Sequence, residues 1–108
     1  MAGNLGELEQ LVLLALLRLG DEGYGVTVRH ELETAARRQI DLGTVYKTLL
    51  RLEEKGLISA RIGPPTAERG GRRKKLYWVL PAGHRALDRS LEALRRMASG
   101  LSTALEGR

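Results

Sequence analysis

Residues 41–56 read DLGTVYKTLLRLEEKG, and this stretch decides the fold. Asp41 is suited to cap a helix, because its carboxylate can accept hydrogen bonds from the free amides of the first turn. Gly56 can adopt the left-handed conformation that ends many helices. One side of the intervening helix, over 42–55, is aliphatic and is expected to pack inward. Its members are Val45, Leu49 and Leu52.

The opposite side of this helix is polar and positively charged. It holds Thr44, Lys47 and Arg51, with Thr48 at the edge. In a major groove, Arg and Lys donate to guanine O6 and N7, while Thr bonds a phosphate or meets a thymine methyl. Tyr46 lies between the two sides, where its hydroxyl could reach a phosphate or its ring could fill the core. A solvated surface would carry similar residues, so this helix alone leaves both interpretations open.

Two further helices are predicted upstream. The first begins near Asn4, which forms a capping-box pattern with Glu7, and continues to Leu19. It is apolar almost all the way round, so it is expected to be covered on two sides, one of them supplied by another subunit. The second is predicted over 24–37, with one aliphatic side. That side consists of Val28, Leu32 and Ala35.

A β-hairpin is predicted after Gly56. Residues 57–62 and 74–80 alternate as strands do, and Pro81 ends the second strand because it cannot donate a ladder hydrogen bond. The residues expected on the inward faces are Ile58, Ala60 and Ile62 in the first strand and Leu76, Trp78 and Leu80 in the second.

The formal positive surplus of the chain lies in this hairpin. The whole chain has 18 cations and 13 anions, a balance of +5, and residues 61–75 carry six cations against Glu68, which is also +5. The six cations are Arg61, Arg69, Arg72, Arg73, Lys74 and Lys75. A phosphate backbone is the natural partner of such a segment. The competing interpretation is a solvated loop whose charges only aid solubility.

A last helix is predicted over 82–105. Its aliphatic residues are spaced 4, 3, 4, 3 and 4 apart, as in a helix that packs along another helix. They are Leu87, Leu91, Leu94, Ala98, Leu101 and Leu105. Gly100 interrupts this pattern at a cost of roughly 1 kcal/mol relative to Ala. Docking on Leu11 and Leu14 of a second copy predicts a homodimer; packing within one chain is the alternative.

Composition excludes several functional classes. The 108 residues include no cysteine, so thiolate metal sites, disulfides and thiol nucleophiles are absent. The apolar run 11–17 is far shorter than the roughly 20 residues that span a bilayer, and no secretory signal is visible, so a cytoplasmic location is expected. His30 and His84 lie at no spacing typical of a triad or metal site. We therefore expect no enzyme activity, metal or cofactor.

Three helices followed by a basic hairpin describe a winged helix, mainly α with a small β-hairpin. The sequence resembles the PadR-like family of bacterial transcriptional regulators. The residues that match its S-x-G-T-L-Y-x-x-L-x-x-L-x-x-x-G-L-I signature are 41–46, Leu49, Leu52 and 56–58. Residues 23–25 resemble the family's opening of the second helix, and 77–83 resemble its Y-x-L-T-x-x-G exit from the wing. The resemblance extends over roughly 5–87.

The resemblance implies a homodimeric repressor with a DNA-binding part over 1–81 and a dimerisation helix over 82–108. Double-stranded DNA is then the expected partner, and the recognition-helix residues carried over are Thr44, Tyr46, Lys47 and Arg51. The resemblance places the wing at 61–75. A winged helix that binds protein or RNA is the alternative. Some small relatives bind flat drugs between aromatic residues at the dimer centre, but this last helix has no aromatic residue; any small-molecule effector is undetermined.

Overall fold

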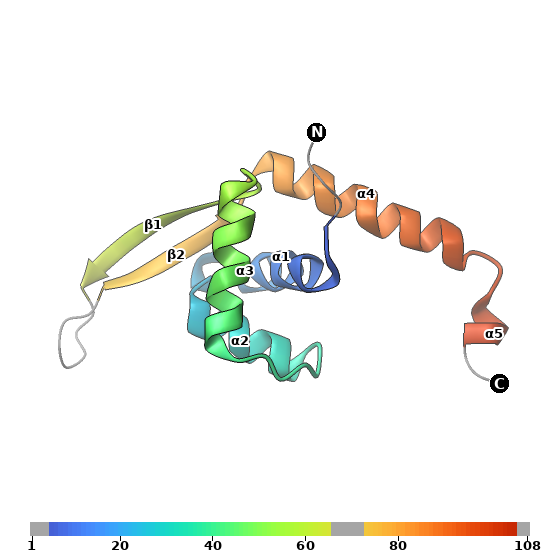
Figure 1. The fold of residues 1–108 in the computed structure, drawn as a ribbon, viewed down its shortest axis with the longest axis horizontal. Helices are drawn as coiled ribbons and strands as arrows, with labels where there is room; N and C mark the ends of the chain where they lie inside the picture. Colours follow the sequence, from blue (N-terminus) through green and yellow to red (C-terminus); the bar gives the residue numbers. More distant parts are fainter. Residues whose placement is uncertain (1–4, 66–72, 106–108) are drawn as a thin grey trace.

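The computed structural model describes residues 5–65 and 73–105 (Figure 1). In chain order, its elements are α1 (Glu7–Leu19), the 3₁₀ turn η1 (Gly20–Glu22), α2 (Gly25–Thr34), α3 (Leu42–Glu54), β1 (Ile58–Pro65), β2 (Arg73–Val79), α4 (Pro81–Ala98) and α5 (Ser102–Leu105). The two strands form one antiparallel hairpin. This architecture confirms the predicted winged helix, mainly α with a small β-hairpin.

The core lies where α1, α2 and α3 pack against one another beside the hairpin base (Figure 1). Val45, Leu49 and Leu52 of α3 are fully buried, as their spacing predicts. From α1, Val12 and Leu13 reach the same core. Because the core contains no phenylalanine and almost only aliphatic side chains, its stability comes from close packing of Leu, Val and Ile.

The helix boundaries differ from the prediction at two places. Helix α1 begins at Glu7. The Glu9 carboxylate caps its start, because Glu9 Oε1 accepts a hydrogen bond from the Gly6 amide at 2.8 Å. Asn4, the predicted cap, lies outside the described residues. Helix α2 ends at Thr34, three residues early, because Arg37 adopts a left-handed φ of 57°.

Both ends of α3 confirm the capping prediction. The Asp41 carboxylate accepts from the Thr44 amide at 3.1 Å and from the Thr44 hydroxyl at 2.7 Å. The donation by that hydroxyl, followed by that of the amide, holds the pKa of Asp41 below its ordinary value of 3.8. At the other end, Gly56 has a left-handed φ of 75°.

The predicted inward face of β2 is wrong. Ile58 pairs with Val79 and Ala60 pairs with Tyr77, and paired residues of an antiparallel ladder project to the same side. Tyr77 is therefore buried, whereas Trp78 points to the other side and stays 40 % exposed. A contact outside the hairpin also fixes which residues of β2 face inward, since the Tyr77 amide donates to the Gly23 carbonyl at 2.8 Å.

The outer end of the hairpin projects beyond the helices, which explains a second difference (Figure 1). Ile62 was expected inward with Ile58 and Ala60, yet it is exposed because the core ends before it. Residues 66–72, which include Arg69 and Arg72, lie outside the described part of the chain.

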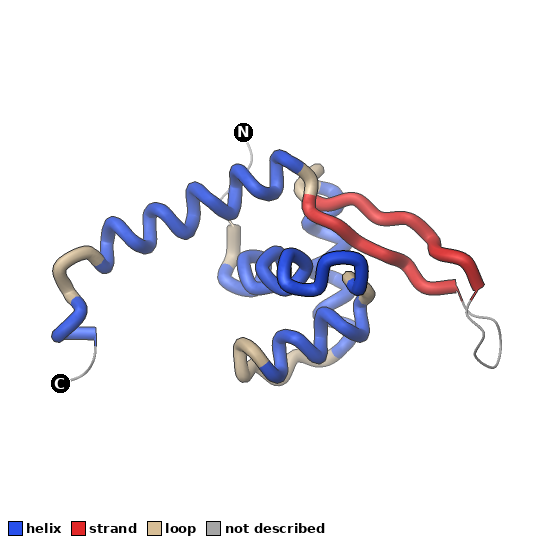
Figure 2. Tube along the Cα trace, turned by 180° about the vertical axis from the view of Figure 1, so that it is seen from behind, coloured by secondary structure: helices blue, strands red, loops and turns tan. Residues whose placement is uncertain are grey.

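The C-terminal region is two helices rather than the single helix predicted over 82–105. Helix α4 starts at Pro81 and ends at Ala98, where Gly100 takes a left-handed φ of 79°, and α5 follows as a short helix. Leu87 is buried against the core, so this part of the predicted stripe packs within the chain. The rest of α4 leaves the body (Figure 2).

Candidate nucleic-acid interface

The outward side of α3 carries the predicted cations. Lys47 and Arg51 are both exposed and lie one helical turn apart, on the side opposite the buried residues of α3. Thr44 is partly exposed on the same side, although its hydroxyl already donates to Asp41. Neither cation forms an ion pair among the described residues, so the helix presents both to an external partner.

The prediction that Thr48 belongs to the DNA-contacting side of α3 is wrong. Its side chain is only 2 % exposed, and its hydroxyl donates to the Thr44 carbonyl at 2.9 Å. A Thr hydroxyl that returns to the carbonyl four residues earlier has no unsatisfied donor and can be buried. Thr48 therefore belongs to the packed side of α3 and cannot face a groove.

Tyr46 is partly packed and partly exposed, so its role in DNA contact stays a prediction. Part of its ring packs against Gly25 at the start of α2, where any Cβ would overlap the ring. Tyr46 as a whole is 43 % exposed. Glycine at position 25 is thus required for α3 to approach α2, and the exposed part of Tyr46 joins the outward side of α3.

The wing base is arranged by contacts that sequence analysis missed. Lys74 Nζ lies 5.5 Å from the ring centroid of Tyr24, and Lys75 Nζ lies 5.6 Å from that of Tyr77. Lys75 also lies 3.5 Å from Glu53 Oε1 at the end of α3. Such cation–aromatic contacts stabilise by about 0.5–1 kcal/mol at exposed sites. No sequence spacing links these residues, because they come from separate elements.

Burial of Tyr77 raises the pKa of its hydroxyl, and the charges of Tyr46 and Glu53 act in the same direction. The phenol is therefore neutral under ordinary conditions and remains a hydrogen-bonding and packing group. Tyr77 thus holds the wing base against the helices.

The structure describes only two of the remaining predicted wing cations. Arg61 is exposed on β1, and Arg73 enters the ladder through its backbone pairing with Pro65. Arg69 and Arg72 fall among the residues that the structure does not describe. In Figure 1 the hairpin projects beside α3, so both charged elements extend from one end of the body.

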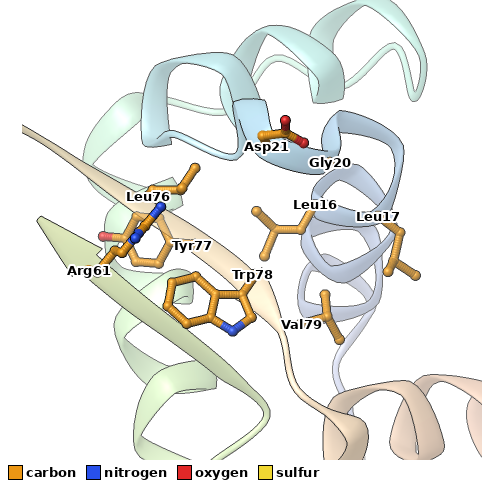
Figure 3. Close-up of a pocket in the computed structure, with 9 residues that line it drawn as sticks. All are labelled: Leu16, Leu17, Gly20, Asp21, Arg61, Leu76, Tyr77, Trp78 and Val79. Atoms are coloured by element: carbon orange, nitrogen blue, oxygen red, sulfur yellow. The ribbon is translucent and has the colours of Figure 1, made fainter. Parts of the chain in front are cut away.

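A shallow apolar groove of about 510 Å³ lies on the other face of the hairpin, between β2 and the end of α1 (Figure 3). Leu16, Leu17 and Trp78 line it, with Asp21 and Arg61 among its polar residues. No α3 residue lines this groove. It is therefore a surface distinct from the outward side of α3.

Helix α4 leaves an apolar stripe without cover in this chain. Leu94 is 58 % exposed, and Met97, Ala98 and Leu101 are also exposed. The body of the molecule lies against the first turns of α4, and the second half extends away from it (Figures 1 and 2). Leu91 is half-buried at the transition.

Within residues 5–65 and 73–105, no group of three or more His, Asp or Glu side chains is placed to hold a metal ion. None of the helices in the described part of the chain is both long and apolar enough to cross a membrane.

The model of the transcriptional regulator PadR-like family matches residues 13–89, from the middle of α1 into α4. The chain belongs to this family. As a PadR-like protein it is a DNA-binding transcriptional regulator rather than an enzyme, which confirms the class predicted from the sequence.

Solved structures of PadR-like proteins share the fold. A PadR family regulator from Clostridium difficile R20291 is 24% identical, with a TM-score of 0.72 over 93% of this chain and 99% of that chain. One from Eggerthella lenta DSM 2243 is 27% identical, with a TM-score of 0.67 over 94% and 88%. A third, from Bacillus cereus strain ATCC 14579, is 22% identical, with a TM-score of 0.71 over 94% and 93%. A search of curated protein sequences gave no significant match.

Proposed function

We propose that this PadR-like chain is a homodimeric transcriptional repressor. In this proposal α3 enters the major groove of duplex DNA, and the wing contacts flanking phosphates or the minor groove. The observation that carries it is the pair of exposed cations Lys47 and Arg51 on α3, beside a projecting hairpin that carries Arg61 and Lys74.

The side chains of α3 suit a groove of alternating donors and acceptors. Arg51 can donate two parallel hydrogen bonds to guanine O6 and N7, while Lys47 can bond either a base edge or a phosphate. The exposed part of Tyr46 and the partly exposed Thr44 flank them. A carboxylate, Glu54, is exposed toward the end of α3, so we expect that end to lie farther from the DNA backbone.

The wing supplies charge without base specificity. Lys74 is exposed and forms no ion pair among the described residues, whereas Lys75 is partly neutralised by Glu53. Arg61 is exposed on the adjacent strand. On the sequence argument we add Arg69, Arg72 and Arg73 to the proposed contacts. Each phosphate neutralised by such a group releases counterions and strengthens binding at low salt.

Dimerisation would cover the two apolar surfaces that one copy leaves open. The exposed stripe of α4 has the chemistry to fit the groove between β2 and α1 of a second copy, and the reverse contact follows from two-fold symmetry. The residues proposed for this interface are Leu11, Leu14, Leu17, Trp78, Leu91, Leu94, Ala98, Leu101 and Leu105. Leu87 is removed from the predicted set, because it is buried within its own chain.

The domain division follows the same logic. We propose residues 1–81 as the DNA-binding part and 82–108 as the dimerisation segment, with the qualification that Gly83 and Leu87 pack into the winged-helix core. In the two-fold dimer, the α3 helices would lie about 34 Å apart, so the operator would be a pseudo-palindrome. Because the proposed target is chromosomal DNA, we also propose a cytoplasmic location.

Salt-dependent binding to duplex DNA tests this function. We expect log K to fall by about 0.9 per log unit of salt for each phosphate contact. Replacing Arg72, Arg73, Lys74 and Lys75 with Ala should reduce this slope by about three units for each bound subunit, and so by about six for the dimer, since Lys75 is shared with Glu53. The measurement is fluorescence anisotropy on a duplex selected from random sequence, repeated at several salt concentrations.

A matched control removes the same charge elsewhere. The four exposed arginines of α4, which are Arg85, Arg89, Arg95 and Arg96, are replaced with Ala, and the slope should hardly change. Equal reductions in both variants would mean that net charge alone governs binding. Equal affinity for single-stranded RNA would instead support the RNA-binding alternative. With the selected site placed across a promoter, repression predicts less transcript as protein is added.

A further inference from the structure

Leu50 is an exposed apolar side chain on the outward side of α3, next to Lys47 and the exposed part of Tyr46. It is 54 % exposed, although its neighbour Leu49 is fully buried. Tyr46 and Lys47 lie one helical turn before it on the same side, and Arg51 follows it directly. Sequence analysis did not single out Leu50, because it considered only the polar and charged residues of the outward side as candidate contacts.

Within one chain, Leu50 does not contribute to the hydrophobic core. Val45, Leu49 and Leu52 already fill the core side of α3, and the apolar groove between β2 and α1 contains no α3 residue. Single exposed leucines are common on protein surfaces. Leu50 differs from these because it lies between the exposed part of Tyr46 and Lys47, one turn before it, on the surface that we propose to enter a groove, with Glu54 one turn after it.

We propose that Leu50, together with the exposed part of the Tyr46 ring, contacts the C5 methyl group of a thymine in the major groove. The chain would then prefer thymine at one position in each half of its operator. This inference rests on the proposed function, since it assumes that α3 lies in the major groove of duplex DNA.

Thymine is the base whose chemistry matches this side chain. In the major groove it offers an apolar methyl group, whereas the other three bases present only hydrogen-bond donors and acceptors there. Leu50 laid against the amino group of cytosine would bury a donor without a partner, which is unfavourable. The neighbouring Lys47 and Arg51 remain free to bond adjacent guanines or phosphates. The outward side of α3 would thus contact both an apolar methyl group and the polar edges or phosphates of the DNA.

Removal of single methyl groups from the DNA tests the inference. On a duplex selected by the wild-type protein, each thymine is replaced in turn by deoxyuridine, which lacks only the C5 methyl. We expect the wild-type Kd to rise about fourfold at one position in each half-site, the factor for one buried carbon, and to change little elsewhere. Leu50→Ala should bind the unmodified duplex about tenfold more weakly and be insensitive to the replacement.

Two checks keep the result interpretable. Leu50→Ala should retain the circular dichroism and unfolding midpoint of the wild type, because the side chain is exposed and Ala favours the helix. Glu54→Ala changes another exposed residue one turn farther along α3. It should keep the wild-type ratio of uracil to thymine affinities, whatever its overall affinity.

The outcomes separate this inference from the proposed function. Salt-dependent duplex binding with no effect of any uracil, or equal uracil sensitivity in wild type and Leu50→Ala, would overturn the thymine contact alone. Failure of the wild-type protein to bind any duplex would overturn the proposed function and the inference with it. A Leu50→Ala variant that binds the selected duplex as tightly as wild type would also refute the contact.

Discussion

Glu9 is the only charged residue buried among those that the structure describes. Its carboxylate accepts from Lys55 Nζ at 2.9 and 3.0 Å and from the Gly6 amide at 2.8 Å, so it joins the start of α1 to the end of α3. Burial acts to raise the pKa of Glu9, but the Gly6 and Lys55 hydrogen bonds together outweigh it and leave the pKa below the ordinary 4.5.

We expect Glu9→Gln to lower the free energy of unfolding by about 1–3 kcal/mol near neutral pH, because Lys55 loses its buried partner. A lowered folded-state pKa means that the ionised carboxylate stabilises the fold above the unfolded pKa and loses this effect as the pH falls through the folded pKa. The difference between wild type and variant should therefore shrink below about pH 4.5. Urea titrations across this range measure it.

Glu7→Gln is the matched control for this pair. Glu7 lies two residues earlier in α1 and forms an ion pair with Arg38 at 3.1 Å, but both side chains are exposed. Exposed ion pairs contribute little to stability, so this variant should unfold close to wild type. A larger loss for Glu7→Gln than for Glu9→Gln would contradict the role assigned to the buried pair.

At the scale of elements, the attachment of α4 depends on Gly83. A Cβ at this position would overlap the Leu57 carbonyl oxygen and lie 2.8 Å from Val79 Cγ1. The first turn of α4 thus packs directly on the backbone that leaves α3. No side chain fits between these two segments, so the direction in which α4 leaves the body is fixed there.

Gly83→Ala should lower the free energy of unfolding by about 1–3 kcal/mol through this overlap. The sign is informative, because Ala at an unobstructed helix position would instead stabilise by roughly 1 kcal/mol. Thermal unfolding measures the change. His84→Ala, at the exposed neighbouring position, serves as the control and should be nearly neutral. Stabilisation by Gly83→Ala would show that α4 does not pack as described.

At the scale of the whole molecule, the chain is elongated, with extents of 53 × 33 × 21 Å, because the hairpin and α4 project from opposite sides of the body. An exposed apolar stripe of the kind on α4 marks a surface that packs against a partner. In the proposed dimer that partner is a second copy, so assembly and operator spacing depend on the same helix.

Leu94→Glu should produce a folded monomer, since Leu94 is exposed in one chain and would be buried between two. Sedimentation velocity at micromolar concentration is the measurement, with circular dichroism to confirm that the monomer retains its helices. Leu94→Met keeps the side chain apolar and should remain dimeric. A wild-type protein that sediments as a stable monomer would refute the proposed dimer.

Local chemistry in the sequence determined the recognition helix and the charged hairpin. The Asp41 cap, the Gly56 end and the buried side of α3 all follow from contacts within a few residues, so spacing alone was enough to predict them. The clustering of cations in the hairpin is likewise a property of the chain itself, and the family followed from motifs in these same segments.

Tertiary contacts decided which residues are buried where the sequence pattern allowed two answers. Both faces of β2 carry bulky apolar residues, so periodicity could not choose between Tyr77 and Trp78; pairing with β1 and the Gly23 carbonyl chose Tyr77. Thr48, expected at the edge of the polar side, is buried for the same reason, since the neighbours of α3 set which arc of the helix is covered. A pattern records which residues share a side, whereas burial depends on what the rest of the chain packs against that side.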